Sequence, residues 1–184
     1  MDARPLRADA RRNQERLIAA ARDAFTEHGE SASLDDIVKR AGVGPGTLYR
    51  HFPNREALLG AVYVDGVTSL AAQAKELSET LPPMAALTEF LRVQVQYGKS
   101  RKGLGVAVKA MFSSDSDVLT WCRDTLRAAV GMLLEAAQAE GEVRADIEPA
   151  VVLRLAHGVA TASEFSPDDS ERMLAIVIDG LRPR

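Results

Sequence analysis

The sequence has little of several features that mark particular classes of protein. Its 184 residues include one cysteine, so no disulfide can form within the chain, as is usual in the reducing cytoplasm. The aliphatic run at residues 174–178 is far too short to cross a bilayer, and residues 1–10 lack the apolar core of a secretory signal. We therefore expect a soluble cytoplasmic protein that is not in contact with a membrane.

Aromatic residues are also scarce, at 5%, whereas Ala, Leu, Arg and Glu are abundant, and this mixture favours helix over strand. No stretch alternates between apolar and polar residues over the length of a strand. Apolar residues instead recur at helical spacing in nine stretches, at about 11–28, 33–41, 45–52, 54–81, 84–98, 104–113, 117–140, 149–164 and 168–181. We therefore expect an all-α protein of about nine helices.

The chain also lacks a strong positive charge. Its formal net charge is −3, and residues 1–58 carry +1 while residues 59–184 carry −4. Nucleic-acid-binding domains commonly show a basic surface, so charge alone does not identify such a partner here. Evidence for a nucleic-acid partner therefore has to come from a sequence motif.

Residues 33–53 have the layout of a helix-turn-helix. Ser33 begins a short helix, with Asp36 three residues later in capping-box position. A Gly-Val-Gly turn at 42–44 follows, Pro45 fits the first position of the next helix, and Pro53 ends it. From the spacing alone, a capped surface turn whose Tyr and His cover the core explains the same residues equally well.

The third helix presents side chains suited to a DNA groove. Leu48 and Phe52 are four residues apart and are expected to face inward, which leaves residues 45–47 and 49–51 on the outer side. Arg50 can make a bidentate contact to guanine, and Pro45 can pack on a thymine methyl group. Thr47, Tyr49 and His51 can donate hydrogen bonds to phosphates.

The stretch 41–59, AGVGPGTLYRHFPNREALL, resembles the DNA-binding signature of the TetR family of bacterial regulators. The match continues upstream through RLIAAARDAFTEHG at 16–29 and SLDDIVKRAG at 33–42. The resemblance implies that the third helix enters the major groove and that Arg55 anchors a phosphate. Our candidate DNA-binding residues are Arg11, Arg12, Ser33, Gly44, Pro45, Gly46, Thr47, Tyr49, Arg50, His51 and Arg55.

The chain departs from the family pattern at the start of the third helix. Gly44 stands where the family often has a small hydroxyl residue, so a helix cap and a phosphate contact are expected to be missing. Gly46 follows closely, and the first turn therefore carries little side chain. Direct base readout should then fall mainly on Pro45, Tyr49 and Arg50.

The family resemblance also implies a homodimer and a ligand cavity in a second helical domain. We expect a DNA-binding domain at 1–53, with about the first ten residues disordered, and a ligand-binding and dimerisation domain at 54–184 that begins with the connecting helix 54–81. Apolar and aromatic stripes suggest a pocket, although the same spacing is typical of an ordinary core. The candidate pocket residues are Met84, Leu87, Phe90, Leu91, Met111, Phe112, Trp121 and Cys122.

The last two predicted helices are apolar on more than one face. A helix at the end of a chain cannot bury two faces within so small a domain, so a symmetric dimer interface is the economical explanation. The candidate interface residues are Val152, Leu155, Ala156, Val159, Ala160, Ser163, Met173, Ile176 and Val177.

These features together predict a homodimeric repressor that a small, largely apolar ligand releases from a palindromic operator, with no cofactor and no metal. A ligand-independent architectural DNA-binding protein is the first alternative. An all-α enzyme is the second, but His28, His51 and His157 fall on different predicted helices. The sequence also has no HExxH motif, no cysteine pair, no phosphate-binding glycine loop and no serine elbow.

Overall fold

The computed structural model of the protein describes residues 4–163 and 169–183, and within these ranges every regular element is a helix. The chain forms two compact units, which we call unit 1 (Met1–Gly66 and Arg101–Val118) and unit 2 (Val67–Ser100 and Leu119–Arg184). Unit 1 contains α1 (Arg4–His28), the 3₁₀ turn η1 (Gly29–Ser31), α2 (Leu34–Ala41), α3 (Pro45–His51) and α6 (Lys102–Met111). Unit 2 contains α5 (Pro83–Ser100), almost all of α7 (Asp117–Ala139), α8 (Pro149–Ala162) and α9 (Ser170–Leu181), and α4 (Arg55–Thr80) is divided between the units.

The all-α prediction is confirmed, and most helix ends lie within about two residues of those expected from the sequence. The largest difference is at the amino terminus, where α1 begins at Arg4 rather than near Arg11. Residues 4–10, which we expected to be disordered, form the first turns of that helix. The break predicted at 165–167, together with the adjoining ends predicted at residues 164 and 168, lies outside the described residues.

Local sequence explains the helix ends around α2 and α3. The Ser33 hydroxyl oxygen accepts a hydrogen bond from the Asp36 amide at 3.4 Å, which caps α2. Gly42 ends α2 in the left-handed conformation, with a φ of 62° that glycine adopts without strain. The Asn54 side chain accepts from the Ala57 amide at 2.7 Å and caps α4. The turn between the two short helices is therefore fixed by residues next to it in sequence.

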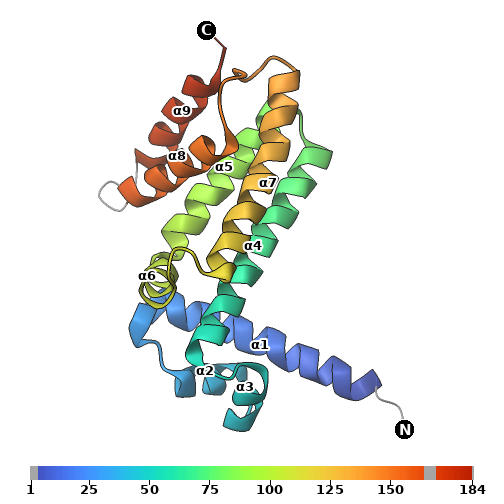
Figure 1. The fold of residues 1–184 in the computed structure, drawn as a ribbon, viewed down its shortest axis with the longest axis vertical. Coiled ribbons are helices and arrows are strands. Elements are labelled where there is room, and N and C mark those ends of the chain that lie inside the picture. The colour runs from blue at the N-terminus through green and yellow to red at the C-terminus, as the bar shows by residue number, and fades with distance from the viewer. Residues whose placement is uncertain (1–3, 164–168, 184) are drawn as a thin grey trace. The chain divides into compact units, whose positions relative to one another are not determined.

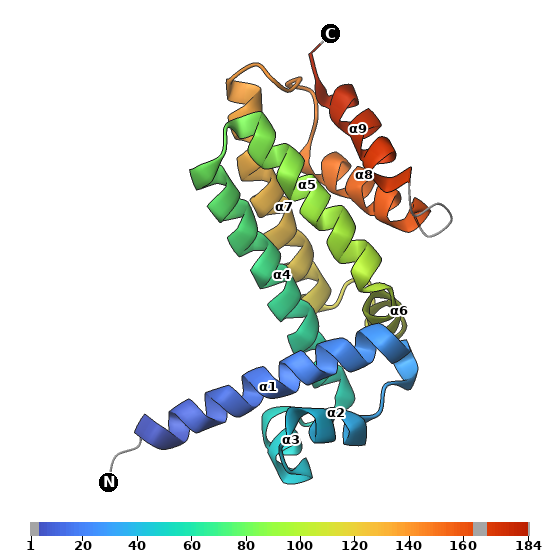
Figure 2. The same cartoon turned by 180° about the vertical axis from the view of Figure 1, so that it is seen from behind.

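Unit 1 packs α2 and α3 side by side next to α1, as both ribbon views show (Figure 1, Figure 2). Its interior is formed by apolar side chains with at most 2% of their surface exposed, including Leu17, Ala21, Phe25, Ile37, Leu48, Leu58 and Leu59. α6 lies against the end of α1, where Gly103 meets the main chain of α1. A Cβ on Gly103 would lie 2.7 Å from the Phe25 carbonyl oxygen, so no larger residue fits there without a shift of the backbone.

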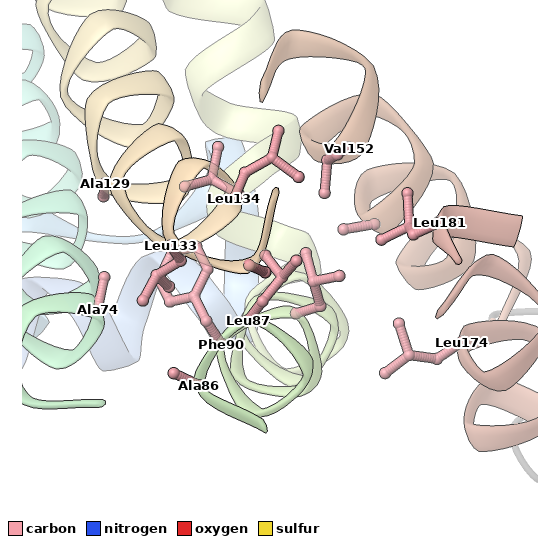
Figure 3. Close-up of a cluster of buried hydrophobic side chains, with 14 of the residues drawn as sticks. Ala74, Ala86, Leu87, Phe90, Ala129, Leu133, Leu134, Val152, Leu174 and Leu181 are labelled. Carbon is pink, nitrogen blue, oxygen red and sulfur yellow. The ribbon is translucent and has the colours of Figure 1, made fainter. Parts of the chain in front are cut away.

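Unit 2 is organised around a cluster of aliphatic side chains and Phe90 (Figure 3). α5 and α7 supply most of this core, while Val152 of α8 and Leu174 and Leu181 of α9 cover it from the other side. α8 approaches α5 closely, because a Cβ on Gly98 would lie 2.8 Å from the Ala160 Cβ. Burial of each such side chain stabilises the unit by roughly 1.5–3 kcal/mol relative to its exposed state.

One described helix, α4, is long and apolar enough to cross a membrane when length and composition alone are considered. Its apolar residues have another explanation in the structure, because they lie in the interiors of the two units. Those buried to 1% exposure or less are Leu58, Leu59, Val62, Val67, Leu70 and Ala74.

Candidate nucleic-acid interface

The outer side of α3 carries the residues that the sequence predicted to face DNA. Leu48 and Phe52 are only 2% and 5% exposed and anchor the helix to unit 1. Pro45, Gly46 and Arg50 are exposed, as is Tyr49 with 56% of its surface accessible. Thr47 and His51 are half-buried at the edges of this surface. The structure therefore brings the predicted reading residues together on one exposed helix face.

Arg50 is the cation best placed for readout, because it is exposed and its guanidinium group makes no ion pair with any of the described residues. Lys39 of α2 is also exposed and has no ion pair within the described part of the chain, and it was not among the residues predicted from the sequence. Its place in the last turn of α2, just before the turn to α3, is the signal that could have indicated it. Both cations are free to meet a phosphate or a base.

The other arginines of this region hold the elements of unit 1 together. Arg40 makes a two-pronged contact to Glu27 of α1, at 3.0 and 2.8 Å, and its Nε lies 2.6 Å from Asp36. The hydrogen bond from Arg40 lowers the pKa of Glu27. Arg16 donates to the Gly42 carbonyl at 3.3 Å, and Arg22 pairs with Asp65 of α4. These contacts join elements that lie far apart in the sequence, so local sequence patterns do not predict them.

Arg55 has protein partners that the family resemblance did not imply. One Nη donates to the Ala32 carbonyl and the other donates to the Glu30 carbonyl at 2.6 Å. The guanidinium carbon also lies 5.0 Å from the centre of the Phe25 ring, within the range of a cation–π interaction. The side chain is half-buried and is directed at main-chain carbonyl groups of unit 1.

The remaining polar candidates lie at the edges of the helix-turn-helix. Arg11 and Arg12 are exposed on α1, but Glu15 and Asp9 lie 3.5 and 3.3 Å from them and partly neutralise their charge. Ser33 is exposed, and its oxygen accepts the capping hydrogen bond while its hydroxyl proton stays free to be donated.

Gly44 and Gly46 are not required by the packing of unit 1. A Cβ on either residue would meet nothing within 4 Å, and neither has a positive φ. Gly44 is the N-cap of α3 and makes no side-chain capping bond, as the sequence departure predicted. The reading helix therefore begins with an open, uncapped first turn.

The candidate pocket residues lie in different environments in the structure. Leu87, Phe90 and Leu91 have no exposed surface and form part of the packed core of unit 2. Met111 and Phe112 belong to unit 1, whereas Trp121 lies in unit 2 with 45% of its surface exposed. Met84 is half-buried against the core.

Cys122, the last pocket candidate, is 1% exposed, and burial raises the pKa of its thiol to about 11. Two surface grooves among the described residues of unit 2 contain none of the predicted pocket residues. One runs along α7 beside Pro149, and the other lies between α4 and α5. A core stripe and a pocket stripe have the same helical spacing, so the spacing alone does not separate the two.

The candidate interface residues are divided between exposed and buried positions. Leu155 and Ile176 are exposed, at 42% and 65%, and Met173 and Val177 are half-buried. The other candidates are buried within the unit itself and are not accessible to a partner: Val152, Ala156, Val159, Ala160 and Ser163. The periodicity identified apolar faces correctly but did not distinguish the face that packs on α5 from the outer face.

Within residues 4–163 and 169–183, no group of three or more His, Cys, Asp or Glu side chains is arranged to hold a metal ion.

Comparison with known proteins decides the family. Residues 17–62 match the family of bacterial regulatory proteins named for TetR, and residues 82–183 match the C-terminal domain of SbtR-like transcriptional regulators. This chain belongs to the TetR family. The resemblance drawn from residues 16–59 is thereby confirmed, and the exposed face of α3 belongs to the helix-turn-helix of a DNA-binding transcriptional regulator.

Relatives of this TetR-family regulator extend over most of its length. It is 28% identical over 154 residues to the HTH-type transcriptional regulator UidR of Escherichia coli K12, which covers 82% of this chain and 79% of UidR. It is 37% identical to a TetR regulator of known structure from Streptomyces coelicolor, with a TM-score of 0.78 and coverage of 92% and 98% of the two chains. A TetR regulator from Mycobacterium vanbaalenii gives the same identity and TM-score, over 97% and 100%.

Proposed function

We propose that this TetR-family regulator is a homodimeric repressor that binds a palindromic operator through α3 and is released by a small effector bound to unit 2. The observation that carries the proposal is the exposed face of α3. It presents Arg50, which has no ion pair among residues 4–163 and 169–183, and Tyr49 with 56% of its surface accessible, on a helix anchored by Leu48. An arginine in this position suits bidentate recognition of guanine in the major groove.

The outer faces of α8 and α9 support a dimer. Leu155 and Ile176 are exposed there, and Gly158 and Gly180 lie within the same two helices with nothing within 4 Å of a Cβ. A glycine inside a helix costs about 1 kcal/mol relative to alanine, and no packing within the protomer explains these two. The close approach of a partner helix would explain them. A two-fold dimer places two reading helices on inverted half-sites, which is why we expect a palindromic operator.

The groove between α4 and α5 is the site that we propose for the effector, in place of the pocket predicted from the sequence. It is lined by apolar and polar groups together, among them Leu70, Val93, Gln73 and Arg92. This lining suits a small amphiphilic molecule better than a purely apolar one. α4 continues without a break from this groove into unit 1, so a ligand that displaces α4 would act on the helix that carries Arg55.

An architectural DNA-binding protein without an effector is the second candidate. The observation that favours it is the closed core of unit 2, in which Leu87, Phe90 and Leu91 have no exposed surface. Under either proposal the protein is not an enzyme and acts in the cytoplasm, where the bacterial chromosome lies.

Selection from a pool of random double-stranded DNA with the purified full-length protein tests the proposal. We expect enrichment of an inverted repeat whose half-site centres are separated by roughly 34–36 Å or a multiple of that distance. The Arg50→Ala variant serves as the control and should enrich a degenerate sequence. Recovery of DNA without any shared sequence would refute a specific operator.

Titration of candidate effectors tests the second half of the proposal. Coupling between two sites is reciprocal, so operator DNA must weaken effector binding by the same factor by which the effector weakens operator binding. Equal affinity of an effector for free and operator-bound protein would exclude its role as an inducer. If no compound in a broad screen weakens operator binding, the architectural candidate is favoured.

A further inference from the structure

The short turn η1 between α1 and α2 is held from two directions by elements distant in sequence. η1 spans Gly29–Ser31 and is followed by Ala32 and by Ser33, the N-cap of α2. α6 contacts it from one direction, and the side chain of Arg55 reaches its carbonyl groups from α4. Any displacement of this turn moves the residue at which α2 begins.

The contact from α4 is directional. Arg55 donates to the carbonyls of Glu30 and Ala32 through its two terminal nitrogens, and its guanidinium plane lies near the Phe25 ring. Carbonyl groups at the end of a helix carry partial negative charge and otherwise lack hydrogen-bond donors, so a cation there is favourable. The planar fork of arginine can reach two carbonyls in a fixed geometry, which the ammonium group of lysine cannot reproduce.

The contact from α6 is a close approach of main chains. Gly29 is buried with a φ of 55°, and a Cβ on it would lie 3.4 Å from the Gly103 carbonyl oxygen. A Cβ on Gly103 would lie 2.7 Å from the Phe25 carbonyl oxygen and 3.0 Å from the Thr26 carbonyl carbon. The α6 contact therefore depends on the absence of a side chain at Gly103.

Both contacts to η1 come from helices that lie next to a boundary between the two units. α4 continues from Arg55 across the boundary at Gly66 into unit 2, and α6 follows Arg101, where the chain returns from α5. Both helices that hold η1 thus lie at or next to a point where the chain passes from one unit to the other, as α7 also does. A change in either helix reaches the start of α2 through this turn.

We propose that Arg55 and Gly103 are positioning residues for DNA binding: together they hold η1 so that α2 and α3 are set for the operator, and Arg55 is not a phosphate contact. The proposal rests on the DNA-binding function of the helix-turn-helix. It differs from the role that the family resemblance implied for Arg55, because the guanidinium group is directed at carbonyls of its own chain.

Salt dependence separates the two roles of Arg55. Each phosphate contact contributes about 0.9 to the slope of log affinity against log salt concentration, so loss of one contact flattens the slope by about that amount. A positioning residue lowers affinity for the operator and leaves the slope unchanged. Lysine preserves the charge of a phosphate contact, whereas it does not replace the two-carbonyl fork.

The experiment measures operator affinity per folded protein, from 50 to 200 mM salt, for the full-length protein and the variants Arg55→Lys, Arg55→Gln and Gly103→Ala. Gly105→Ala is the matched control, because it lies in the same helix and its Cβ would meet nothing within 4 Å. Thermal unfolding of each variant shows which fraction is folded. If Gly103→Ala does not fold, the two Arg55 variants carry the test.

We expect both Arg55 variants to bind the operator at least tenfold more weakly at an unchanged salt slope. Gly103→Ala should also weaken operator binding at an unchanged salt slope, although it alters no charge. Gly105→Ala should bind the operator like the unsubstituted protein. The double variant Arg55→Gln/Gly103→Ala should lose less than the product of the single losses, since both act on one turn.

Three results would overturn the inference. Arg55→Lys could retain full affinity, Arg55→Gln could flatten the salt slope by about 0.9, or the variants could differ only in thermal stability with normal affinity per folded protein. Failure of the unsubstituted protein to select any operator would refute the proposed function instead, so the two failures are distinguishable.

Discussion

Different kinds of interaction connect the helices within each of the two units. In unit 1, charged side chains connect separate elements, as Arg40 does with Glu27 and Arg55 with the carbonyls of Glu30 and Ala32. In unit 2, the connections are chiefly apolar, and Phe90 and Leu133 lie at the centre of a large aliphatic cluster. Hydrogen bonds and ion pairs of charged side chains restrict the orientation of the elements that they join, whereas burial of apolar surface is non-directional.

This difference fits the tasks of the two units. Exposed ion pairs contribute little to stability, so the arginine contacts of unit 1 matter more for the orientation of α2 and α3 than for folding. A reading helix displaced by an ångström or more loses hydrogen bonds to base edges, because these have narrow distance limits. An aliphatic core tolerates such small changes and supplies most of the stability.

The largest effect that we expect tests the core of unit 2. Phe90 is fully buried, so Phe90→Ala should lower the free energy of unfolding by about 3–5 kcal/mol. Urea denaturation followed by circular dichroism measures this loss, and Phe90→Leu should lose much less because it preserves most of the volume. Loss of under about 1 kcal/mol would mean that Phe90 lines an open cavity, in line with its place among the candidate pocket residues.

The second effect concerns the outer face of α8. Leu155→Arg should place a charge in the proposed dimer interface and weaken dimerisation by on the order of 2–3 kcal/mol, which is roughly 30- to 150-fold. Sedimentation velocity at several concentrations measures the dissociation constant, and Ala139→Arg, at the exposed end of α7, is the control. A Leu155→Arg protein that remains fully dimeric would place the interface on another surface.

Ala160→Arg sharpens this comparison between the two faces of α8. Ala160 is 6% exposed, and its Cβ lies at the close approach to Gly98 of α5. The substitution should therefore unfold unit 2 rather than dissociate a folded dimer. Dissociation into stable folded protomers would show that the buried face belongs to the interface after all.

The sequence predicted best the features that depend on neighbouring residues. The cap at Ser33, the left-handed turn at Gly42 and the start of α3 at Pro45 are each determined within a few positions, so their residue types identify them. The family signature covers the same segment. This is why the outer face of α3 could be predicted in detail.

Features that depend on distant partners could not be predicted in the same way. The requirement for glycine at Gly103 comes from the main chain of α1, and the partners of Arg55 lie more than twenty residues away. The apolar spacing of α8 shows that two faces are apolar, but it does not indicate that α5 covers one of them. Long-range packing therefore decides which candidate pocket and interface residues are buried, and helical spacing alone does not show this.

A third, smaller effect tests the reading face of unit 1. Arg50→Ala should lose about 1–3 kcal/mol of operator affinity and relax the preference at one base pair in each half-site. Fluorescence anisotropy with matched and mismatched operators measures this change. Lys39→Ala should instead weaken binding to all sequences alike and flatten the salt slope by about 0.9, since we expect it to hold a phosphate. Equal loss on operator and random DNA for Arg50→Ala would reassign Arg50 as a phosphate contact.

The smallest effect concerns the uncapped start of α3. Gly44 has extended backbone angles typical of an N-cap, makes no capping bond, and leaves open space where a side chain would stand. Gly44→Ser should raise the free energy of unfolding by only a few tenths of a kcal/mol, because glycine is already a tolerable N-cap. Gly44→Ala should instead be slightly destabilising, because alanine has no side-chain oxygen to cap the helix and is a poorer N-cap residue than glycine.

Operator affinity should respond to Gly44→Ser more than stability does. A hydroxyl group at this position can donate to a phosphate, and one added hydrogen bond of about 0.5–1.5 kcal/mol tightens binding roughly 2- to 12-fold. The same titration with Gly44→Ala separates the hydroxyl from the added methyl group. If both variants bound more weakly than the glycine protein, the bare first turn of α3 would itself be required for the approach to DNA, and the departure from the family pattern would be a determinant of recognition.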